Sequence, residues 1–291
     1  MGDGQGSATR GFHNRIAVVF DFDRTLSAGT VDALLDRIGL DDKDGWREQR
    51  LQPMIEEGWD EILAKAHLLA RTAEEQGCAL TRDLVEEVGR GLESYPGVEE
   101  TLDELRKTGA EAGEGAEVEL YVLSSGFVDI MAQAPVARCF DGVWGSSLHW
   151  SDEGELLGVK RTVIHSEKAR YLLAFAKGLD IVGANEPQDV HQDLPSAKWH
   201  VPLDQMIYVG DGASDIDAFK LMHENGGVAI AVDHSDGGEK WQASDHMFSS
   251  AHVENLAPPD FTRGEEMHRS LMLAAEMLGK RVALRSLGVG E

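Results

Sequence analysis

Short apolar runs that end in polar, glycine-rich or acidic residues recur along the chain. The longest of these runs are rich in Val, Ile and Leu, which is typical of strands buried on both faces of a parallel sheet. Six segments have this pattern or a shorter version of it: 16–20, 118–123, 143–148, 205–209, 227–232 and 246–249. Helical patterns lie between several of them, as in 169–177. Strands that alternate with helices predict an α/β fold with a doubly wound, mostly parallel sheet.

One long segment, 31–94, contains no strand-like run. Its apolar residues are three and four positions apart, as at Ile62, Ala66 and Leu69, and acidic residues occupy the other faces. We therefore expect an all-helical insert directly after the first strand, joined to the rest by links that contain Gly and Pro. The expected organisation is a disordered tail (1–14), a core (15–28 and 95–255), a helical insert (29–94) and a C-terminal helical extension that packs on the core (256–291).

The charge of the chain limits its partners. Its 291 residues include 27 basic and 52 acidic side chains, so the formal net charge is −25. This charge argues against nucleic acid or an anionic membrane surface as a partner. It also opposes an anionic substrate at long range, but salt screens that repulsion beyond about 8 Å, and one cation about 4 Å from a phosphate contributes ~4 kcal/mol. An anionic substrate would therefore need local cations.

The two cysteines, Cys78 and Cys139, lie in the predicted insert and in the predicted core, so we expect no disulfide between them and a reducing compartment. Residues 1–14 lack the apolar run of a signal peptide, and no apolar run reaches the length that spans a membrane. We therefore predict a cytoplasmic protein that has no membrane partner.

The first apolar run ends in two aspartates, Asp21 and Asp23. In open α/β sheets the carboxyl ends of the strands form the edge where ligands bind. Two close carboxylates repel each other as anions, so such a pair implies a bound cation or a shared proton. The alternative interpretation is a solvated turn after a strand.

Three further segments carry chemically useful side chains. They are Ser124-Ser125-Gly126, Lys168 at the start of a helical pattern, and Gly210-Asp211-Gly212-Ala213-Ser214-Asp215. Together with Asp21 and Asp23, and in this order, they match the four motifs of the haloacid dehalogenase superfamily of aspartate-nucleophile phosphatases. The chain resembles that superfamily over roughly residues 15–250, and it looks most like the phosphoserine-phosphatase-like branch. The resemblance implies a Rossmann-like core and a helical cap, the insert, that closes over the active site and selects the substrate.

The resemblance also implies a role for each acid. Asp21 would be the nucleophile that forms an aspartyl-phosphate, and Asp23 would be the general acid and base that protonates the leaving group and then activates water. A Mg²⁺ ion would be bound by the Asp21 carboxylate and the Asp23 backbone carbonyl, with Asp211 as a second carboxylate ligand and Asp215 in support. The alternative for Asp211 and Asp215 is a helix N-cap and an acid in the first helical turn.

Phosphate contacts are implied for the Ser124 hydroxyl and for the backbone N–H groups of Ser125 and Gly126 at a helix start. Lys168 would neutralise both the phosphate and the nucleophile, and Lys160 is a competing candidate for that role. The alternatives are an N-cap for the serine and a surface position for the lysine.

Further substrate contacts are predicted for Thr25 and, in the cap, for Arg47 and Arg50, which could reach an acidic group on the substrate. Two departures from the family pattern bear on the substrate. Arg24 stands where many relatives have a small residue, and the segment 27–30 lacks the glutamate with which serine-selective relatives bind an amino group. The second departure argues against phosphoserine as the substrate.

The sequence thus predicts a Mg²⁺-dependent phosphatase that acts on a small phosphorylated metabolite, as a monomer or a homodimer. A phosphotransferase of the same fold and a catalytically quiet protein that binds phosphate and metal remain alternatives. Asp23 argues against a dehalogenase, which needs no acid for its leaving group. The sequence contains neither a P-loop motif nor a Gly-x-Ser-x-Gly motif, so it does not favour a nucleoside triphosphatase or a serine hydrolase.

Overall fold

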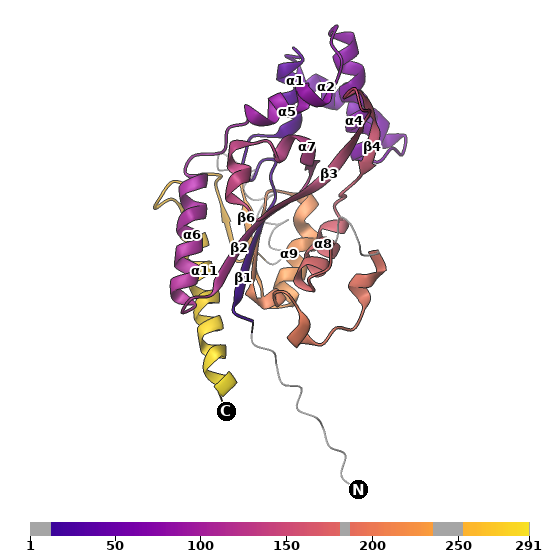
Figure 1. Ribbon diagram of the computed structural model, residues 1–291. Helices are drawn as coiled ribbons and strands as arrows, with labels where there is room; N and C mark the ends of the chain where they lie inside the picture. The colour runs from indigo at the N-terminus through magenta and orange to yellow at the C-terminus, as the bar shows by residue number, and fades with distance from the viewer. Residues whose placement is uncertain (1–12, 181–186, 235–252, 291) are drawn as a thin grey trace.

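The computed structural model describes residues 13–180, 187–234 and 253–290. A seven-stranded sheet in the order β4-β3-β2-β1-β5-β6-β7 runs through the middle of the molecule (Figure 1). Neighbouring strands pair in parallel except β3 and β4, which are antiparallel. The strands are β1 (Arg15–Phe20), β2 (Glu117–Phe127), β3 (Gly142–Trp150), β4 (Leu156–Arg161), β5 (Met206–Gly210), β6 (Val228–Val232) and β7 (Asn255–Ala257). The predicted α/β fold with a mostly parallel sheet is confirmed.

Strand β1 is the central strand, paired with β2 on one side and with β5 on the other. Its residues from Ile16 to Phe20 are fully buried. Alternate side chains point to opposite faces of a strand, and here Val18 packs in one hydrophobic core while Val19 packs in the other. The sheet therefore has a core on each face, which explains the unbroken apolar run and places Asp21 at the middle of the carboxyl edge.

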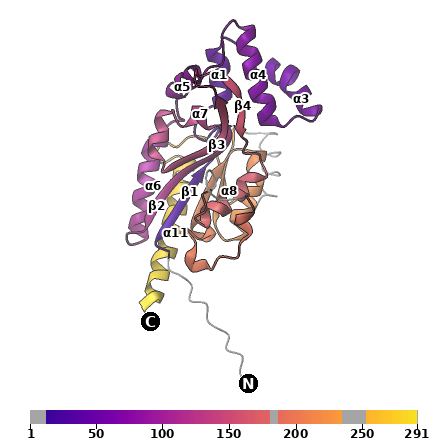
Figure 2. The ribbon, with the colours of Figure 1, turned by 45° about the vertical axis from the view of Figure 1, so that its right-hand side comes forward.

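Two pairs of helices cover the sheet (Figures 1 and 2). Helices α6 (Val98–Ala112) and α11 (Glu266–Ser286) contribute to the core that contains Val18. On the opposite face lie α8 (Glu167–Ala176) and α9 (Ile216–Glu224). Helix α11 approaches α6 closely at Gly279. A Cβ added at this glycine would lie only 2.6 Å from Cβ of Ala112.

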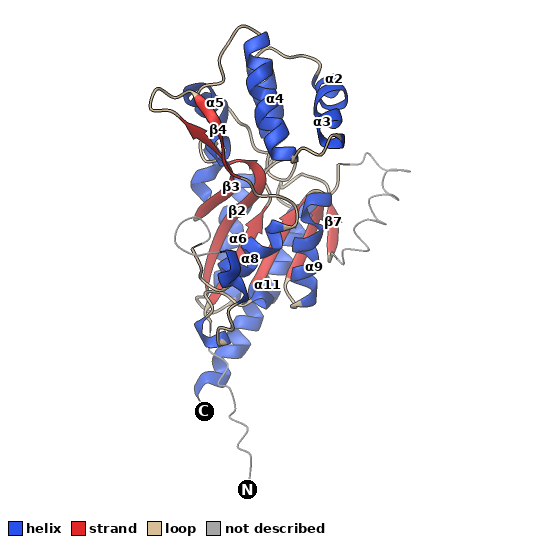
Figure 3. Cartoon of the chain, turned by 90° about the vertical axis from the view of Figure 1, so that its right-hand side faces the viewer, coloured by secondary structure: helices blue, strands red, loops and turns tan. Residues whose placement is uncertain are grey.

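The segment between β1 and α6 is helical and lies beyond the carboxyl edge of the sheet, where it forms a cap (Figure 3). Its helices are α1 (Thr30–Arg37), α2 (Lys43–Trp46), the π-helix Arg47–Leu51, α3 (Gln52–Glu56), α4 (Glu61–Glu75) and α5 (Arg82–Arg90). Trp46 Nε1 donates a 2.8 Å hydrogen bond to Thr72 Oγ1, which ties α2 to α4. The fold thus includes the inserted helical cap that the sequence predicts. The residue limits of the tail, core, cap and extension remain predictions.

Two strands of the sheet, β4 and β7, are not predicted from the sequence. Strand β4 is an edge strand that pairs only partly with β3, contains Gly158 and contacts α4 of the cap. Strand β7 is only three residues long. The strand predicted at 246–249 and most of the predicted tail lie outside the described residues.

Shorter elements complete the fold. Helix α7 (Val128–Met131) follows β2. The 3₁₀ turns are Pro135–Cys139, Pro187–His191, Ser196–Lys198, Leu203–Gln205, Ala213–Asp215 and Leu287–Gly290. Two of these turns lie in 179–201, a segment for which the sequence predicts no element and of which 181–186 lie outside the described residues.

Cys78 and Cys139 are both free thiols, as expected. Among the described helices, none has the length and apolar character needed to cross a membrane.

Candidate active site

Asp21 is held firmly at the edge of the sheet. It follows β1 directly, and its backbone N–H donates a 2.8 Å hydrogen bond to the carbonyl of Val209 in β5. Its Oδ1 accepts a 2.8 Å hydrogen bond from the N–H of Phe22, and the residue is 4% exposed. The other carboxylate oxygen, Oδ2, lies 3.0 Å from the ammonium of Lys168.

Lys168 is a fully buried cation between two carboxylates. It lies in the first turn of α8, and its Nζ is 2.6 Å from Asp215 Oδ1 as well as 3.0 Å from Asp21 Oδ2. Burial by itself would lower the pKa of Lys168, but the two carboxylates outweigh it and raise the pKa. The lysine therefore stays charged at the point where a phosphate bound to Asp21 would need a cation. The alternative of a surface lysine is wrong.

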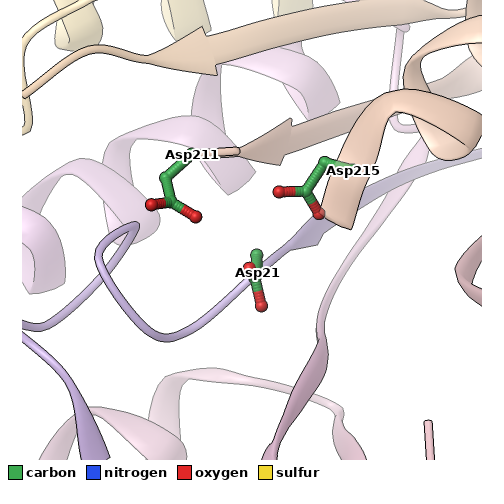
Figure 4. Close-up of side chains that lie close together, drawn as sticks. All are labelled: Asp21, Asp211 and Asp215. Atoms are coloured by element: carbon green, nitrogen blue, oxygen red, sulfur yellow. The ribbon is translucent and has the colours of Figure 1, made fainter. Parts of the chain in front are cut away.

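Asp211 and Asp215 come from the segment after β5 and converge with Asp21 (Figure 4). Each of the three offers a carboxylate oxygen within 4.8 Å of the others. The pKa of Asp211 is raised to about 7, mainly by burial and to a smaller extent by repulsion from neighbouring carboxylates. The pKa of Asp21 is raised to about 6, mainly by burial and against the attraction of Lys168. Hard oxygen donors that repel one another in this way fit a cation such as Mg²⁺.

Asp215 is already well supplied with hydrogen bonds. Its Oδ1 accepts from Lys168 and, at 2.6 Å, from the phenol of Tyr208, while Oδ2 accepts from the N–H of Gly212 at 3.1 Å. This arrangement suits a residue that positions Lys168 and the Asp211 loop, and it leaves Asp21 and Asp211 as the less hydrogen-bonded of the three candidate ligands. Tyr208, fully buried in β5, was missed by sequence reasoning. A phenol in an otherwise aliphatic strand was the available signal, because a buried hydroxyl needs a partner.

Asp23 lies beside the Ser124–Gly126 segment and is held by α1. The N–H and the hydroxyl of Thr30, the first residue of α1, donate hydrogen bonds of 2.7 and 2.9 Å to its two carboxylate oxygens. Burial raises the pKa of Asp23. A Cβ added at Gly126 would lie 2.8 Å from Asp23 Oδ2, so only glycine permits this approach. Thr30 is a second residue that sequence reasoning missed.

The Ser124–Gly126 segment is the end of strand β2, which continues to Phe127, and not a helix start. This corrects the predicted local structure, and it excludes the N-cap interpretation of Ser124 because α7 begins at Val128. Ser124 is buried, and its Oγ accepts a 3.2 Å hydrogen bond from the N–H of Gly126. The strand continues because Phe127 pairs with Ser146 of β3.

Two buried hydroxyls at the predicted site have no hydrogen-bond partner among the described residues. They are Oγ1 of Thr25 and Oγ of Ser125. Thr25 is a predicted substrate contact, and Ser125 is predicted to contact phosphate through its backbone N–H. Unsatisfied buried polar groups are rare in folded proteins, and a bound ligand, ion or water is the usual explanation. The site thus has unused hydrogen-bonding capacity on both segments that surround Asp23.

Arg24 contacts the acidic group directly. Its backbone is left-handed, with φ of 60°, and its Nε lies 2.9 Å from Asp211 Oδ2. Its carbonyl oxygen accepts a 2.6 Å hydrogen bond from Nε2 of His234. The large residue at this position, which departs from the family pattern, therefore supplies a counter-ion to a predicted metal ligand.

A pocket of about 590 Å³ opens on the cap side of Asp23. Arg24, Arg47 and Lys65 are the basic side chains that line it. Arg47 forms ion pairs with Asp32 and Asp44, which also line the pocket. The structure therefore brings Arg47 to the site.

Two other predicted candidates lie elsewhere. Arg50 is not among the described residues that line this pocket, and its guanidinium binds Glu75 at 2.8 Å. Its predicted substrate contact is thus not supported by the geometry. Lys160, the competitor of Lys168, is exposed on β4.

Comparisons with known proteins bear on the fold. No protein-family model matches the chain. An uncharacterised protein of Borreliella burgdorferi is 23% identical over 284 residues, which cover 89% of this chain and 96% of that protein.

Solved structures resemble the chain over most of its length. A substrate-bound phosphoserine phosphatase is 20% identical with a TM-score of 0.52, over 85% of this chain and 95% of that chain. A HAD-family hydrolase from Salmonella enterica serovar Typhi is 14% identical with a TM-score of 0.57, over 90% and 72% of the two chains. A probable phosphoserine phosphatase from Vibrio cholerae is 15% identical with a TM-score of 0.55, over 94% and 69%. The chain therefore has the haloacid dehalogenase-like hydrolase fold, in the form found in phosphoserine phosphatases.

Proposed function

We propose that the chain is a Mg²⁺-dependent phosphatase that hydrolyses a small phosphomonoester through an aspartyl-phosphate on Asp21. The observation that carries the proposal is the position of the Asp21 carboxylate. One of its oxygens lies 3.0 Å from the buried Lys168 ammonium, and the side chain shares a potential metal site with Asp211. A carboxylate repels a phosphate unless cations neutralise both, and this is the place in the described structure where cationic and acidic groups meet in a buried site.

In this proposal Asp21 attacks phosphorus and the bond to the leaving oxygen breaks. Mg²⁺, when bound by Asp21 and Asp211, supplies positive charge that screens the nucleophile from the phosphate. Lys168 neutralises a phosphate oxygen from the other side, and Asp215 keeps the lysine in place through their 2.6 Å contact. The Ser124 hydroxyl and the unsatisfied Ser125 hydroxyl are donors for the remaining phosphate oxygens.

Asp23 is the proposed general acid and base. Burial raises its pKa, which favours the protonated form that the first step requires. Thr30 fixes both carboxylate oxygens from the start of α1, so the acid faces the leaving group without needing to reorient. After the leaving alkoxide takes this proton, the ionised Asp23 can accept a proton from the water that hydrolyses the aspartyl-phosphate.

The proposed substrate is a small phosphorylated metabolite whose leaving group occupies the 590 Å³ pocket beside Asp23. Structural relatives of the chain include phosphoserine phosphatases, but the segment 27–30 has no acid to bind an amino group. We therefore propose a phosphomonoester other than phosphoserine. The net charge of −25 makes nucleic acid and anionic membranes unsuitable partners.

A screen of phosphorylated metabolites with Mg²⁺, read out as released phosphate, tests the proposal. Asp21→Asn should reduce turnover of any active ester to below about 1% of wild type, because losing a nucleophile removes several kcal/mol of transition-state stabilisation. The matched control is Asp103→Asn, an exposed acid on α6, which should keep full activity. Acid-quenched wild-type enzyme should carry labelled phosphate, and the Asp21 variant should not.

Three results would contradict the proposal. Turnover of the Asp21→Asn variant above about 1% would exclude this nucleophile. Phosphate recovered mainly on added alcohols would indicate a phosphotransferase. Silence of the folded protein on the whole panel would favour a binding role.

A further inference from the structure

Helix α11 has a second apolar surface besides the one that packs on the core. Seven large hydrophobic side chains are exposed among the described residues, and four of them lie on α11 or in the turn after it. These four, which we call the α11 stripe, are Leu273 (64% exposed), Met277 (45%), Leu284 (71%) and Leu287 (74%). Single exposed apolar residues are ordinary, but several on one surface indicate an interaction site.

The α11 stripe occupies one side of the helix. Its members follow one another at intervals of four, seven and three residues, and an α-helix of 3.6 residues per turn keeps them within about 40° of a common line. The buried residues Leu271, Leu278 and Val282 lie on the opposite side and face the core. The stripe is thus a separate surface and not the edge of the contact between α11 and the core.

The stripe is symmetrical about Lys280. Two of its members lie seven and three residues before Lys280, and two lie four and seven residues after it. If two copies of α11 packed antiparallel around a twofold axis at Lys280, Leu273 would meet Leu287 of the second copy, and Met277 would meet Leu284. A twofold interface requires this property, because residue i must contact residue j while j contacts i.

The charge of α11 makes it a region where two copies of the chain repel each other less than elsewhere. The helix carries two acidic and four basic side chains, a formal charge of +2 with His neutral, in a chain of net charge −25. The strongly acidic remainder of the surface therefore repels another copy more than α11 does, and the repulsion between two Lys280 side chains at the axis is reduced because each pairs with a Glu276. Lys280 already pairs with Glu276 on its own helix, and an antiparallel neighbour would bring a second such pair alongside.

We propose that the chain forms a twofold-symmetric homodimer in which two α11 helices pack antiparallel through the α11 stripe. The cap lies at the other end of the molecule (Figures 1 and 3), so the dimer leaves the candidate active site open. The contact extends over only about 21 Å of helix. Its buried area should therefore be smaller than the ~800 Å² per partner of a standard interface. The dimer should therefore be in concentration-dependent equilibrium with the monomer.

Sedimentation velocity on the full chain, across a series of concentrations, tests the proposal. Wild type should shift from monomer to dimer, and added salt should shift it further because salt screens repulsion between two acidic chains. Leu284→Glu should remain monomeric at every concentration. The matched control is Leu157→Glu, another exposed leucine (60%) on β4, which should dimerise like wild type. A monomeric wild type, or a Leu284→Glu variant that dimerises normally, overturns the proposal.

Disulfide trapping tests the geometry independently of the glutamate variants. In a Cys78→Ser background, which removes the exposed native thiol, Lys280→Cys should form an interchain disulfide because both copies lie near the axis. Leu273→Cys alone should not, since its two copies would be about 21 Å apart and a disulfide needs Cα atoms within about 7 Å. A mixture of Leu273→Cys and Leu287→Cys chains should cross-link. Cross-linking of Leu273→Cys alone, or none at Lys280→Cys, overturns the antiparallel arrangement.

Discussion

On the sheet side of the candidate site the charged groups are buried, and on the cap side they are exposed. Lys168 and Asp215 are fully buried and pair with each other, and Lys168 also pairs with Asp21, although the three residues lie in segments far apart in the sequence. The cap-side pairs, Arg47 with Asp32 and Arg50 with Glu75, leave about a third or more of each side chain in solvent.

This difference has an energetic meaning. Removing one partner of a buried pair leaves an uncompensated charge and costs about 3–5 kcal/mol, whereas an exposed pair contributes ~0–1 kcal/mol. The sheet side therefore tolerates little change, which suits the binding of an invariant phosphate. The cap side can exchange partners at small cost, which suits contact with a variable leaving group.

The largest expected effect is that of Lys168→Met, which removes the cation but keeps much of the volume. Asp21 and Asp215 would remain buried beside each other, so we expect a loss of about 3–5 kcal/mol in the free energy of unfolding. Turnover should fall by at least about a hundredfold, because a phosphate-neutralising charge is lost. Chemical denaturation and steady-state kinetics measure the two effects.

Lys160→Met is the matched control for this variant. Lys160 is exposed on β4, so its substitution should change the free energy of unfolding by no more than about 0.5 kcal/mol and leave turnover unchanged. Equal losses in both variants would mean that the burial of Lys168 does not distinguish the two lysines.

The next effect is a pH-dependent stabilisation by Mg²⁺. The pKa values of Asp21 and Asp211 are raised from 3.8 to about 6 and about 7, so the folded protein without metal favours the protonated acids. The free energy of unfolding should therefore fall as pH rises from 3.8 to about 6 through Asp21, and to about 7 through Asp211. Mg²⁺ binds the ionised acids, so the rise in Tm on adding Mg²⁺ should grow from about pH 5 to about pH 8.

Thermal melting with and without Mg²⁺ at several pH values checks this expectation. Asp211→Asn removes one of the two raised pKa values and one ligand, so its Tm should respond much less to Mg²⁺ and to pH. A Tm increase that is the same at both ends of the pH range would show that Mg²⁺ does not bind these acids.

Features that depend on a single segment of the chain were predictable from the sequence, and features that depend on contacts between distant segments were not. The run from Ile16 to Phe20 indicated a central strand because both faces had to be buried, and Asp21 and Asp211 follow their strands directly. The role of Tyr208 was not predictable, because its meaning depends on Asp215 lying opposite, and Arg24 likewise depends on Asp211.

The predictions of local structure were wrong where pairing between distant segments outweighed the local preference of the residues. Ser124-Ser125-Gly126 is a reasonable helix start by composition, yet pairing of Phe127 with Ser146 of β3 extends the strand through it. Strand β4 was missed because Gly158 and two basic residues weaken its apolar pattern, and it is stabilised by β3 and the cap. Interactions between distant segments decided both cases.

A smaller effect is expected from Tyr208→Phe, which removes one hydroxyl from the buried side. Asp215 would keep Lys168 and Gly212 as donors but lose its 2.6 Å hydrogen bond to the phenol. We expect about 1–2 kcal/mol less stability and a several-fold lower kcat with little change in KM, because the lysine is less well positioned. Tyr121→Phe is the control, since that phenol also binds a carboxylate, Glu119, but on β2. Equal kinetic effects in the two variants would remove Tyr208 from the site.

The smallest effect should be that of Arg50→Ala on the cap side. Its pair with Glu75 is partly exposed and lies apart from the pocket beside Asp23, so stability should change by less than about 1 kcal/mol and KM should not change. Arg47→Ala is the matched comparison, because Arg47 lines the pocket and binds Asp32 there. That variant should raise KM and leave kcat nearly unchanged, as expected for lost contact with the leaving group. If Arg50→Ala raised KM as much as Arg47→Ala, Arg50 would have to reach the substrate as well, and lining the pocket would no longer distinguish the two arginines.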